Sequence, residues 1–299
     1  MRNDDWRSLY PFQSHWLSID GHRMHYLDEG EGPVLLLVHG NPTWSFYWRE
    51  LVLALRGKYR LIVPDHIGCG MSDKPPVSKY SYQLARRIGD LGRLIEQLDL
   101  ERITLVAHDW GGAIGMGAAV AQPHRFSRFA LMNTAAFRAD HCPWRIRLCH
   151  VPGVGAVGVQ GLNLFVKAAL RMAAEHRRRM TPAVRAGLSA PYNSWANRVA
   201  VLQFAMDIPL KPSHPTYATL VDIENGLTQF ADHPVLLVWG MKDWCFTPAF
   251  LNRFLDFFPK AEVERLDDAG HYVVEDAHER VIPLLDDFLR RTHEPARAV

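Results

Sequence analysis

Asp109 lies in a sequence context that is typical of a catalytic nucleophile. The stretch Val106-Ala-His-Asp-Trp-Gly-Gly112 follows an apolar run and opens a helical stretch of small residues. Small residues allow a tight strand-to-helix turn, which lifts the middle side chain, Asp109, above a sheet. The helix N-terminus would stabilise negative charge at that position. An aspartate that only caps the helix is the alternative, but other catalytic residue types accompany it.

An acid and a histidine follow Asp109 in the chain. Asp243 lies directly after an apolar run, in the sequence Gly-Met-Lys-Asp, and His271 ends the sequence Asp-Ala-Gly-His. The order nucleophile, acid, histidine is the one that accompanies such a strand-to-helix turn. Asp243 would orient the imidazole of His271 and stabilise its cationic form. Without these roles, Asp243 would be a turn residue and His271 a solvated loop histidine.

Two further residues are candidates for stabilising a leaving group. Asn41 lies in the sequence His-Gly-Asn-Pro after a predicted strand, and Trp110 follows Asp109 directly. Backbone N–H groups at these two positions should form an oxyanion hole. The Asn41 amide and the Trp110 indole N–H are additional donors that could converge above Asp109. A turn asparagine and a packed tryptophan are the alternative interpretation.

The elements that must position these residues alternate along the chain. Apolar runs without alternation predict strands buried on both faces of a parallel sheet. Helical stretches at 82–98 and 110–122 lie between them, so the pattern predicts a doubly wound α/β sheet. Segments 15–19 and 22–28 alternate more and predict an antiparallel hairpin at one edge. The predicted buried strands are 34–39, 60–64, 103–107, 128–132 and 235–239.

The alternation stops between about residues 137 and 223, where helical patterns broken by Pro and Gly dominate. We interpret 137–223 as a helical cap inserted after the sixth strand, and 1–136 with 224–299 as the core. Residues 138–220 contain 11 Lys and Arg against 3 Asp and Glu, a net +8 that leaves −6 for the rest. A solvated basic face explains this charge, and docking to an acidic partner or an anionic membrane is the alternative.

Length and composition limit the function classes. The 299 residues suffice for one large domain with an insertion, and a net charge of +2 does not favour nucleic-acid binding. Four cysteines without CxxC spacing give no reason to expect a metal site, and nothing indicates a cofactor. Reduced thiols and an N-terminus without an apolar segment favour a cytoplasmic protein. No stretch is long and apolar enough to predict a transmembrane helix.

Several motifs together resemble the haloalkane dehalogenase family of α/β-hydrolases over nearly the whole chain. The resemblance implies an α/β-hydrolase fold, with a mostly parallel eight-stranded sheet and an inserted helical cap. It also implies Asp109 as nucleophile, His271 as base and Asn41 with Trp110 as the halide-binding pair. One branch places its acid after the sixth strand, where this chain has Asn133, so the acid should be Asp243. The matching stretches are HGNPTWSFYWR, PDHIGCGMSDKP, HDWGG, GMKD and the final Gly-His pair.

Within this family, the sequence Asp65-His-Ile-Gly-Cys-Gly70 is most similar to the OleB-type β-lactone decarboxylases of bacterial long-chain olefin biosynthesis. This resemblance implies a hydrophobic cis-dialkyl β-lactone substrate, a cis-alkene and carbon dioxide as products, and association with other enzymes of that pathway. A haloalkane dehalogenase acting through an aspartyl ester is the alternative. An epoxide hydrolase is a further one, since Tyr192 and Tyr217 lie in the predicted cap, but the pair Asn41 and Trp110 argues against it.

Overall fold

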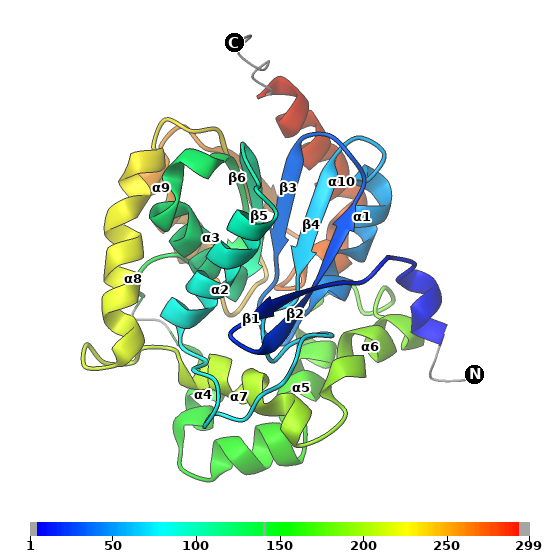
Figure 1. Cartoon of the computed structure of the whole chain (residues 1–299), viewed down its shortest axis with the longest axis vertical. Helices are drawn as coiled ribbons and strands as arrows, with labels where there is room; N and C mark the ends of the chain where they lie inside the picture. Colours follow the sequence, from blue (N-terminus) through cyan, green and yellow to red (C-terminus); the bar gives the residue numbers. More distant parts are fainter. Residues whose placement is uncertain (1–4, 140–141, 293–299) are drawn as a thin grey trace.

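One sheet of eight strands runs through the centre of the molecule. The computed structural model describes residues 5–139 and 142–292 (Figure 1). In these residues the strand order is β1-β2-β4-β3-β5-β6-β7-β8. β2 pairs antiparallel with β1 and β4, and the remaining pairs are parallel, which confirms the predicted sheet and its edge hairpin. The strands are β1 (His15–Ile19), β2 (His22–Glu29), β3 (Val34–Val38), β4 (Arg60–Pro64), β5 (Ile103–Asp109), β6 (Phe126–Thr134), β7 (Val235–Gly240) and β8 (Glu262–Leu266).

The central strands are buried on both faces, as their continuous apolar runs predict. Every residue of β5 is buried, whereas β1 at the edge alternates between exposed and covered positions. β5 extends to Asp109, so the expected nucleophile is the last residue of a central strand. The pattern did not single out β8, because its sequence Glu-Val-Glu-Arg-Leu is half-exposed and mixed in polarity.

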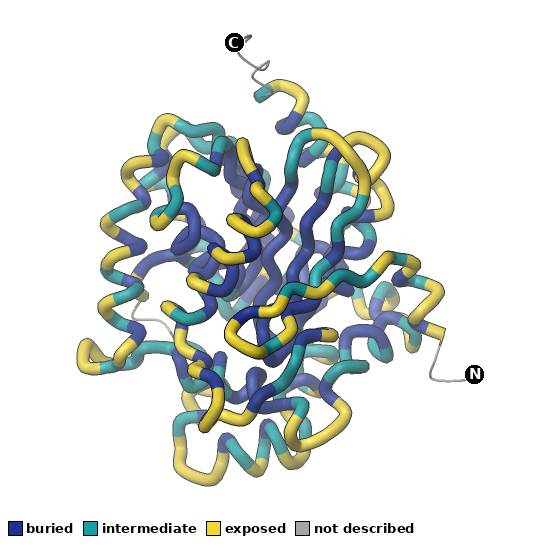
Figure 2. The backbone as a smooth tube through the Cα atoms, in the orientation of Figure 1, coloured by how far each residue is buried: buried dark blue, intermediate teal, exposed yellow. Residues whose placement is uncertain are grey.

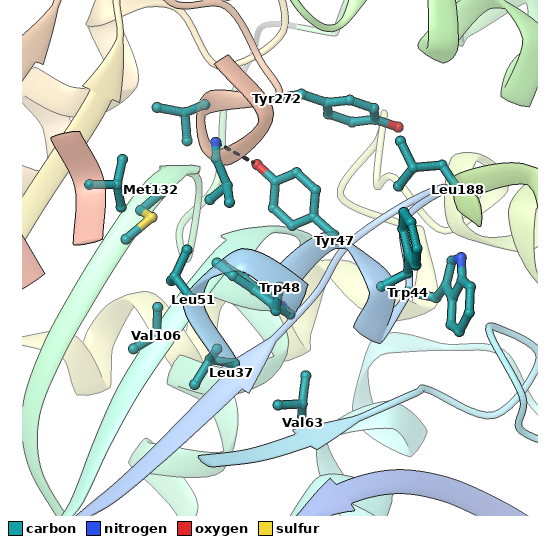
Figure 3. Packing of buried hydrophobic residues seen from close by; sticks show 14 of the residues in the cluster. Leu37, Trp44, Tyr47, Trp48, Leu51, Val63, Val106, Met132, Leu188 and Tyr272 are labelled. Atoms are coloured by element: carbon teal, nitrogen blue, oxygen red, sulfur yellow. Dashed lines mark hydrogen bonds between the residues drawn. The ribbon is translucent and has the colours of Figure 1, made fainter. Parts of the chain in front are cut away.

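Helices cover both faces of the sheet. Alternate residues of one strand enter different hydrophobic clusters: Leu35 and Leu37 pack under α1 and α10, and Leu36 packs under α2, α3 and α9. Figure 3 shows part of the first cluster, with Trp48 and Leu51 lying over the sheet. The covering helices are α1 (Arg49–Leu55), α2 (Leu84–Gln97), α3 (Trp110–Ala121), α8 (Pro215–Gly226), α9 (Pro248–Phe257) and α10 (Val273–Arg291).

A group of shorter helices between β6 and β7 lies at one end of the sheet (the lower end in Figure 1). It corresponds to the predicted cap, whose boundaries at 137 and 223 remain a prediction. α8 spans the second boundary and packs against α2 and α3. In the described residues no helix is long and apolar enough to cross a membrane. The cap helices are α4 (Trp144–Arg147), α5 (Leu164–Met172), α6 (Pro182–Ser189) and α7 (Val199–Met206), with the turns η4 (Leu148–His150), η5 (Ala156–Gly161), η6 (Ala190–Tyr192) and η7 (Ala196–Arg198).

A buried ion pair joins the segment after β3 to the start of α10. Arg49 donates from Nη1 and Nη2 to the two carboxylate oxygens of Glu275, at 2.5 and 2.8 Å, and both side chains are buried. Nearby, the backbone N–H of Val274 donates to the Tyr47 hydroxyl at 3.2 Å (Figure 3). These bonds fix the first turn of α10 against η2 (Ser45–Trp48), so they position the loop that carries His271.

We expect Glu275→Gln to lower the free energy of unfolding by roughly 3 kcal/mol, because it removes the buried charge partner of the Arg49 guanidinium and leaves only the partly exposed Glu50, 3.4 Å away. Urea unfolding followed by circular dichroism measures the change. Asp232→Asn is the control, since Asp232 pairs with Lys260 on the surface, where both side chains are largely exposed. Equal shifts of the unfolding midpoint in the two variants would contradict a stabilising role for the buried pair.

Candidate active site

Asp109 lies at the sharp turn between β5 and α3. Its backbone has φ 54° and ψ −129°, and its side chain makes no capping bond to α3. The capping alternative is therefore excluded, and the geometry is that of a strained nucleophile turn. A Cβ at Gly111 would collide with the carbonyl oxygen of Val38, and one at Gly112 with the Thr134 side chain. The turn can form only because both residues are glycine.

Backbone donors orient the Asp109 carboxylate. The N–H of Asn41 donates to Oδ1 at 2.6 Å, and the backbone N–H groups of Asn41 and Trp110 both lower the pKa of Asp109. Both predicted oxyanion donors thus act on the candidate nucleophile itself. The other oxygen, Oδ2, lies 3.6 Å from His271 Nε2. A carboxylate fixed in this way presents one oxygen for attack on an electrophilic carbon.

The predicted triad residues come together above the sheet. Asp243, in the loop after β7, accepts from His271 Nδ1 through Oδ2 at 2.9 Å. Its other oxygen accepts the backbone N–H of Cys245 at 2.7 Å. Because Asp243 binds Nδ1, Nε2 of the same imidazole is directed at Asp109. Nucleophile, histidine and acid therefore form one connected chain of polar contacts.

The combined effect of burial and neighbouring charges raises the pKa values of both His271 and Asp109. Burial alone lowers the pKa of His271, but the carboxylates of Asp243 and Asp109 outweigh it, so the pKa is raised. Burial also raises the pKa of Asp109, against the opposing effects of His271 and the two backbone N–H donors. The pair therefore favours a cationic imidazole beside a desolvated carboxylate.

Three residues that support the triad could not be assigned from the sequence. The Asn133 side-chain amide donates to Asp243 Oδ2 at 3.0 Å, so this residue holds the acid although it replaces the acid of the other branch. Phe246 stacks on the His271 ring, with centroids 5.7 Å apart. His108 Nε2 donates to the His271 carbonyl at 2.7 Å. The sequence drew attention to His108 only as part of the HDWGG motif, and to Asn133 only as the residue after the predicted sixth strand. It gave no signal for Phe246.

The side chains of Asn41 and Trp110 both line the space above Asp109. One N–H of the Asn41 amide donates to the carbonyl of Val201 in α7, at 3.2 Å. An amide carries two such N–H bonds, so one is left for a leaving group. The Trp110 ring packs against Phe204, with centroids 5.5 Å apart. The structure thus brings the predicted pair to the nucleophile.

Two cavities meet at the nucleophile in the described part of the chain. The first, of about 300 Å³, extends along α5 past Phe165, Ala168 and Met172, and we call it the first arm. The second, of about 290 Å³, extends past Ala135 and Leu210, and we call it the second arm. Apolar side chains make up most of the lining of both arms, and the second arm is also lined by Arg138, Arg147 and Lys211. They share six lining residues, which are Asp109, Trp110, Ile146, Ile208, Cys245 and Phe246.

Comparison with known proteins agrees with this fold. The family described as alpha/beta hydrolase fold matches residues 33–277. Cis-3-alkyl-4-alkyloxetan-2-one decarboxylases of Shewanella oneidensis and Xanthomonas campestris are 44% and 42% identical, over 98% and 91% of this chain and 93% of each relative. Haloalkane dehalogenase 2 of Mycobacterium tuberculosis is 35% identical over 91% of this chain and 93% of its own.

Among solved structures, the haloalkane dehalogenase DatA of Agrobacterium tumefaciens superimposes with a TM-score of 0.85 at 28% identity, covering 94% of this chain and 97% of the other. The eight-stranded, mostly parallel sheet with its covering helices fits the fold of these relatives. The chain therefore belongs to the α/β-hydrolase family, in the group formed by the cis-3-alkyl-4-alkyloxetan-2-one decarboxylases and the haloalkane dehalogenases.

Proposed function

We propose that this protein is a β-lactone decarboxylase that converts a long-chain cis-3,4-dialkyl β-lactone into a cis-alkene and carbon dioxide. The observation that carries the proposal is the pair of apolar arms that meet at Asp109. The substrate has alkyl chains on two adjacent ring carbons, so a lactone ring seated at Asp109 can place one chain in each arm. The decarboxylases at 44% and 42% identity support the same activity.

The arms favour a lactone over a simple alkyl halide. Each buried methylene contributes about 0.8 kcal/mol, so two long chains would supply binding energy from both cavities. A linear halide has one chain and would fill one arm. Haloalkane hydrolysis remains the alternative activity, because the triad also has the geometry to activate water for hydrolysis of an aspartyl ester.

Epoxide hydrolysis is disfavoured by the positions of the two cap tyrosines. Tyr192 is buried, donates its hydroxyl to the carbonyl of Thr43 at 3.1 Å and lines neither arm. Tyr217 lines only the second arm. In the described residues the two hydroxyls therefore do not converge above Asp109, as protonation of an opening epoxide ring would require.

In the proposed reaction, Asp109 attacks the ring carbon that bears the ring oxygen, and the carbon–oxygen bond breaks with inversion. The released group is the lactone's own carboxylate, which Asn41 and Trp110 hold as they would a halide. The bond from that carboxylate to its carbon then breaks, its electron pair forms the double bond, and Asp109 departs from the opposite face. Inversion followed by anti elimination is net syn, so a cis-lactone gives a cis-alkene. No water is consumed.

His271 has an electrostatic role in this route. Its cation lies between the carboxylates of Asp243 and Asp109, where it stabilises Asp109 as it becomes a carboxylate again. Asn133 and Phe246 would hold the acid and the ring in place. The association with other enzymes of olefin biosynthesis and the cytoplasmic location remain predictions from the sequence.

Asp109→Ala should abolish turnover of the lactone while the protein stays folded, because the covalent step loses its nucleophile. Gas chromatography of the released alkene measures turnover, and the circular-dichroism spectrum shows whether the protein stays folded. Asp222→Ala, at an exposed position of α8, is the control and should keep full activity. Wild-type rates in purified Asp109→Ala would exclude the proposed mechanism.

A single turnover in heavy-oxygen water separates lyase from hydrolase. We expect cis-alkene and an unlabelled Asp109, because the ester is resolved by elimination and no water attacks it. Mass spectrometry of the Asp109 peptide and analysis of the product measure this. Label in that peptide, or a β-hydroxy acid as the main product, would show that the ester is hydrolysed. Attack at the lactone carbonyl followed by anti elimination would instead give the trans-alkene.

Blocking the arms one at a time should separate the two chains of the substrate. Ala168→Phe narrows the first arm and Ala135→Phe the second. Loss of contact for two methylenes costs about 1.6 kcal/mol, so each variant should lower kcat/KM for a lactone with two long chains more than about tenfold. Two further lactones each have one short chain, on opposite ring carbons. Each variant should keep near wild-type kcat/KM for the lactone whose short chain lies in the blocked arm, so the two variants should prefer opposite lactones. Ala196→Phe, at the exposed first position of η7, is the control. Identical preferences in both variants would contradict the two-arm assignment.

A further inference from the structure

Exposed apolar side chains gather on one part of the cap. In the described residues, 12 large hydrophobic residues are exposed, and eight of them belong to the cap. The exposed fraction of these eight ranges from 45% for Leu148 and Val151 to 66% for Trp144. In Figure 2 many residues of the cap, at the lower end of the view, are coloured as exposed. We call the set the cap rim: Trp144, Leu148, Val151, Val154, Val157, Leu162, Leu164 and Trp195.

Contacts between its segments show that the rim is one surface. A Cβ placed on Gly161 would lie 3.4 Å from the Trp195 ring, and one on Gly158 would lie 3.7 Å from Leu164. The side-chain amide of Gln160 donates to the carbonyl of Trp195 at 3.3 Å. η5 therefore packs beside both α5 and η7. An apolar patch of this kind on an otherwise polar surface indicates an interaction site.

Positive charge is interspersed with these apolar side chains. Residues 142–174 contain four Lys and Arg and no Asp or Glu. The four, Arg145, Arg147, Lys167 and Arg171, are all exposed. The Arg145 guanidinium lies over the Trp144 ring, 5.2 Å from its centroid. Basic residues among tryptophan and aliphatic side chains are typical of surfaces that lie in the headgroup region of an anionic bilayer.

The first arm opens within the rim. Leu148, Val154 and Leu164 are exposed and also line that arm. A hydrophobic ligand could therefore pass between the surroundings of the rim and the cavity along these three apolar side chains, although Arg145 also lines the arm. A lipid interface is the environment in which such ligands concentrate, which favours a bilayer over an acidic protein as the occupant of this surface.

We propose that the cap rim docks the protein on an anionic phospholipid bilayer, with the mouth of the first arm facing the lipid. The apolar side chains enter the boundary between headgroups and acyl chains, and the four basic residues contact anionic headgroups. This binding does not depend on the identity of the substrate. It is measured without turnover, so failure of the proposed reaction and failure of the docking surface are distinguishable.

Co-sedimentation of the full chain with vesicles tests the proposal. The protein should bind vesicles of phosphatidylethanolamine and phosphatidylglycerol, bind phosphatidylcholine vesicles more weakly, and lose affinity as salt is added. Val157→Ser with Leu162→Ser should lower the affinity at least about tenfold, because both apolar side chains lie in the rim but line neither arm. Lys167→Glu with Arg171→Glu should do the same through charge.

Two matched controls keep the test specific. Leu53→Ser with Val77→Ser removes exposed apolar side chains outside the rim. Lys58→Glu with Lys260→Glu gives the same charge change before β4 and β8, at the end of the sheet opposite the cap. Both controls should bind as wild type. Binding that ignores lipid charge, or equal losses in rim and control variants, would overturn the proposal. So would rim variants that bind vesicles normally but no longer bind a purified partner enzyme.

Discussion

The close approach of β3 to the turn after β5 is the constraint on which the site depends. Because residue 111 is glycine, the start of α3 can lie against the carbonyl of Val38. Because residue 40 is glycine, there is room for the Asp109 carboxylate, with which a Cβ at position 40 would collide. This proximity brings the Asn41 N–H within 2.6 Å of Oδ1. The Asp109 carboxylate is therefore held by a backbone N–H from the loop after β3, and its orientation costs no reorganisation during the proposed reaction.

A second set of contacts fixes the histidine from the opposite side. Asn133 at the end of β6 and the loop after β7 both hold Asp243, which holds His271. The buried pair of Arg49 and Glu275 fixes the helix start behind that loop. Charge and hydrogen bonding thus come from the end of β6 and from the segments that follow β3 and β7, while the cap and the core together line the two arms. The same polar set can serve a lyase or a hydrolase, and the outcome depends on whether water reaches the ester.

The cap connects chemistry with access to substrate. Its inner residues shape cavities on both sides of Asp109, and its outer residues form an apolar and basic surface around one opening. A reaction without water benefits from such a desolvated site, because burial strengthens the electrostatic interactions around the departing carboxylate. The local +8 charge of the cap then has a physical use beyond solubility.

The sequence by itself determined the strand-helix order and the turn at Asp109, and it predicted His271, Asp243, Asn41 and Trp110 as candidate site residues, because these follow from local apolar runs, glycine spacing and motif order. Only the tertiary structure decided what depends on distant segments meeting. Asn133 supports Asp243 across strands, Phe246 stacks on the imidazole, and the two arms arise where cap helices face the core. No local pattern encodes such contacts, because packing between elements far apart in the chain creates them.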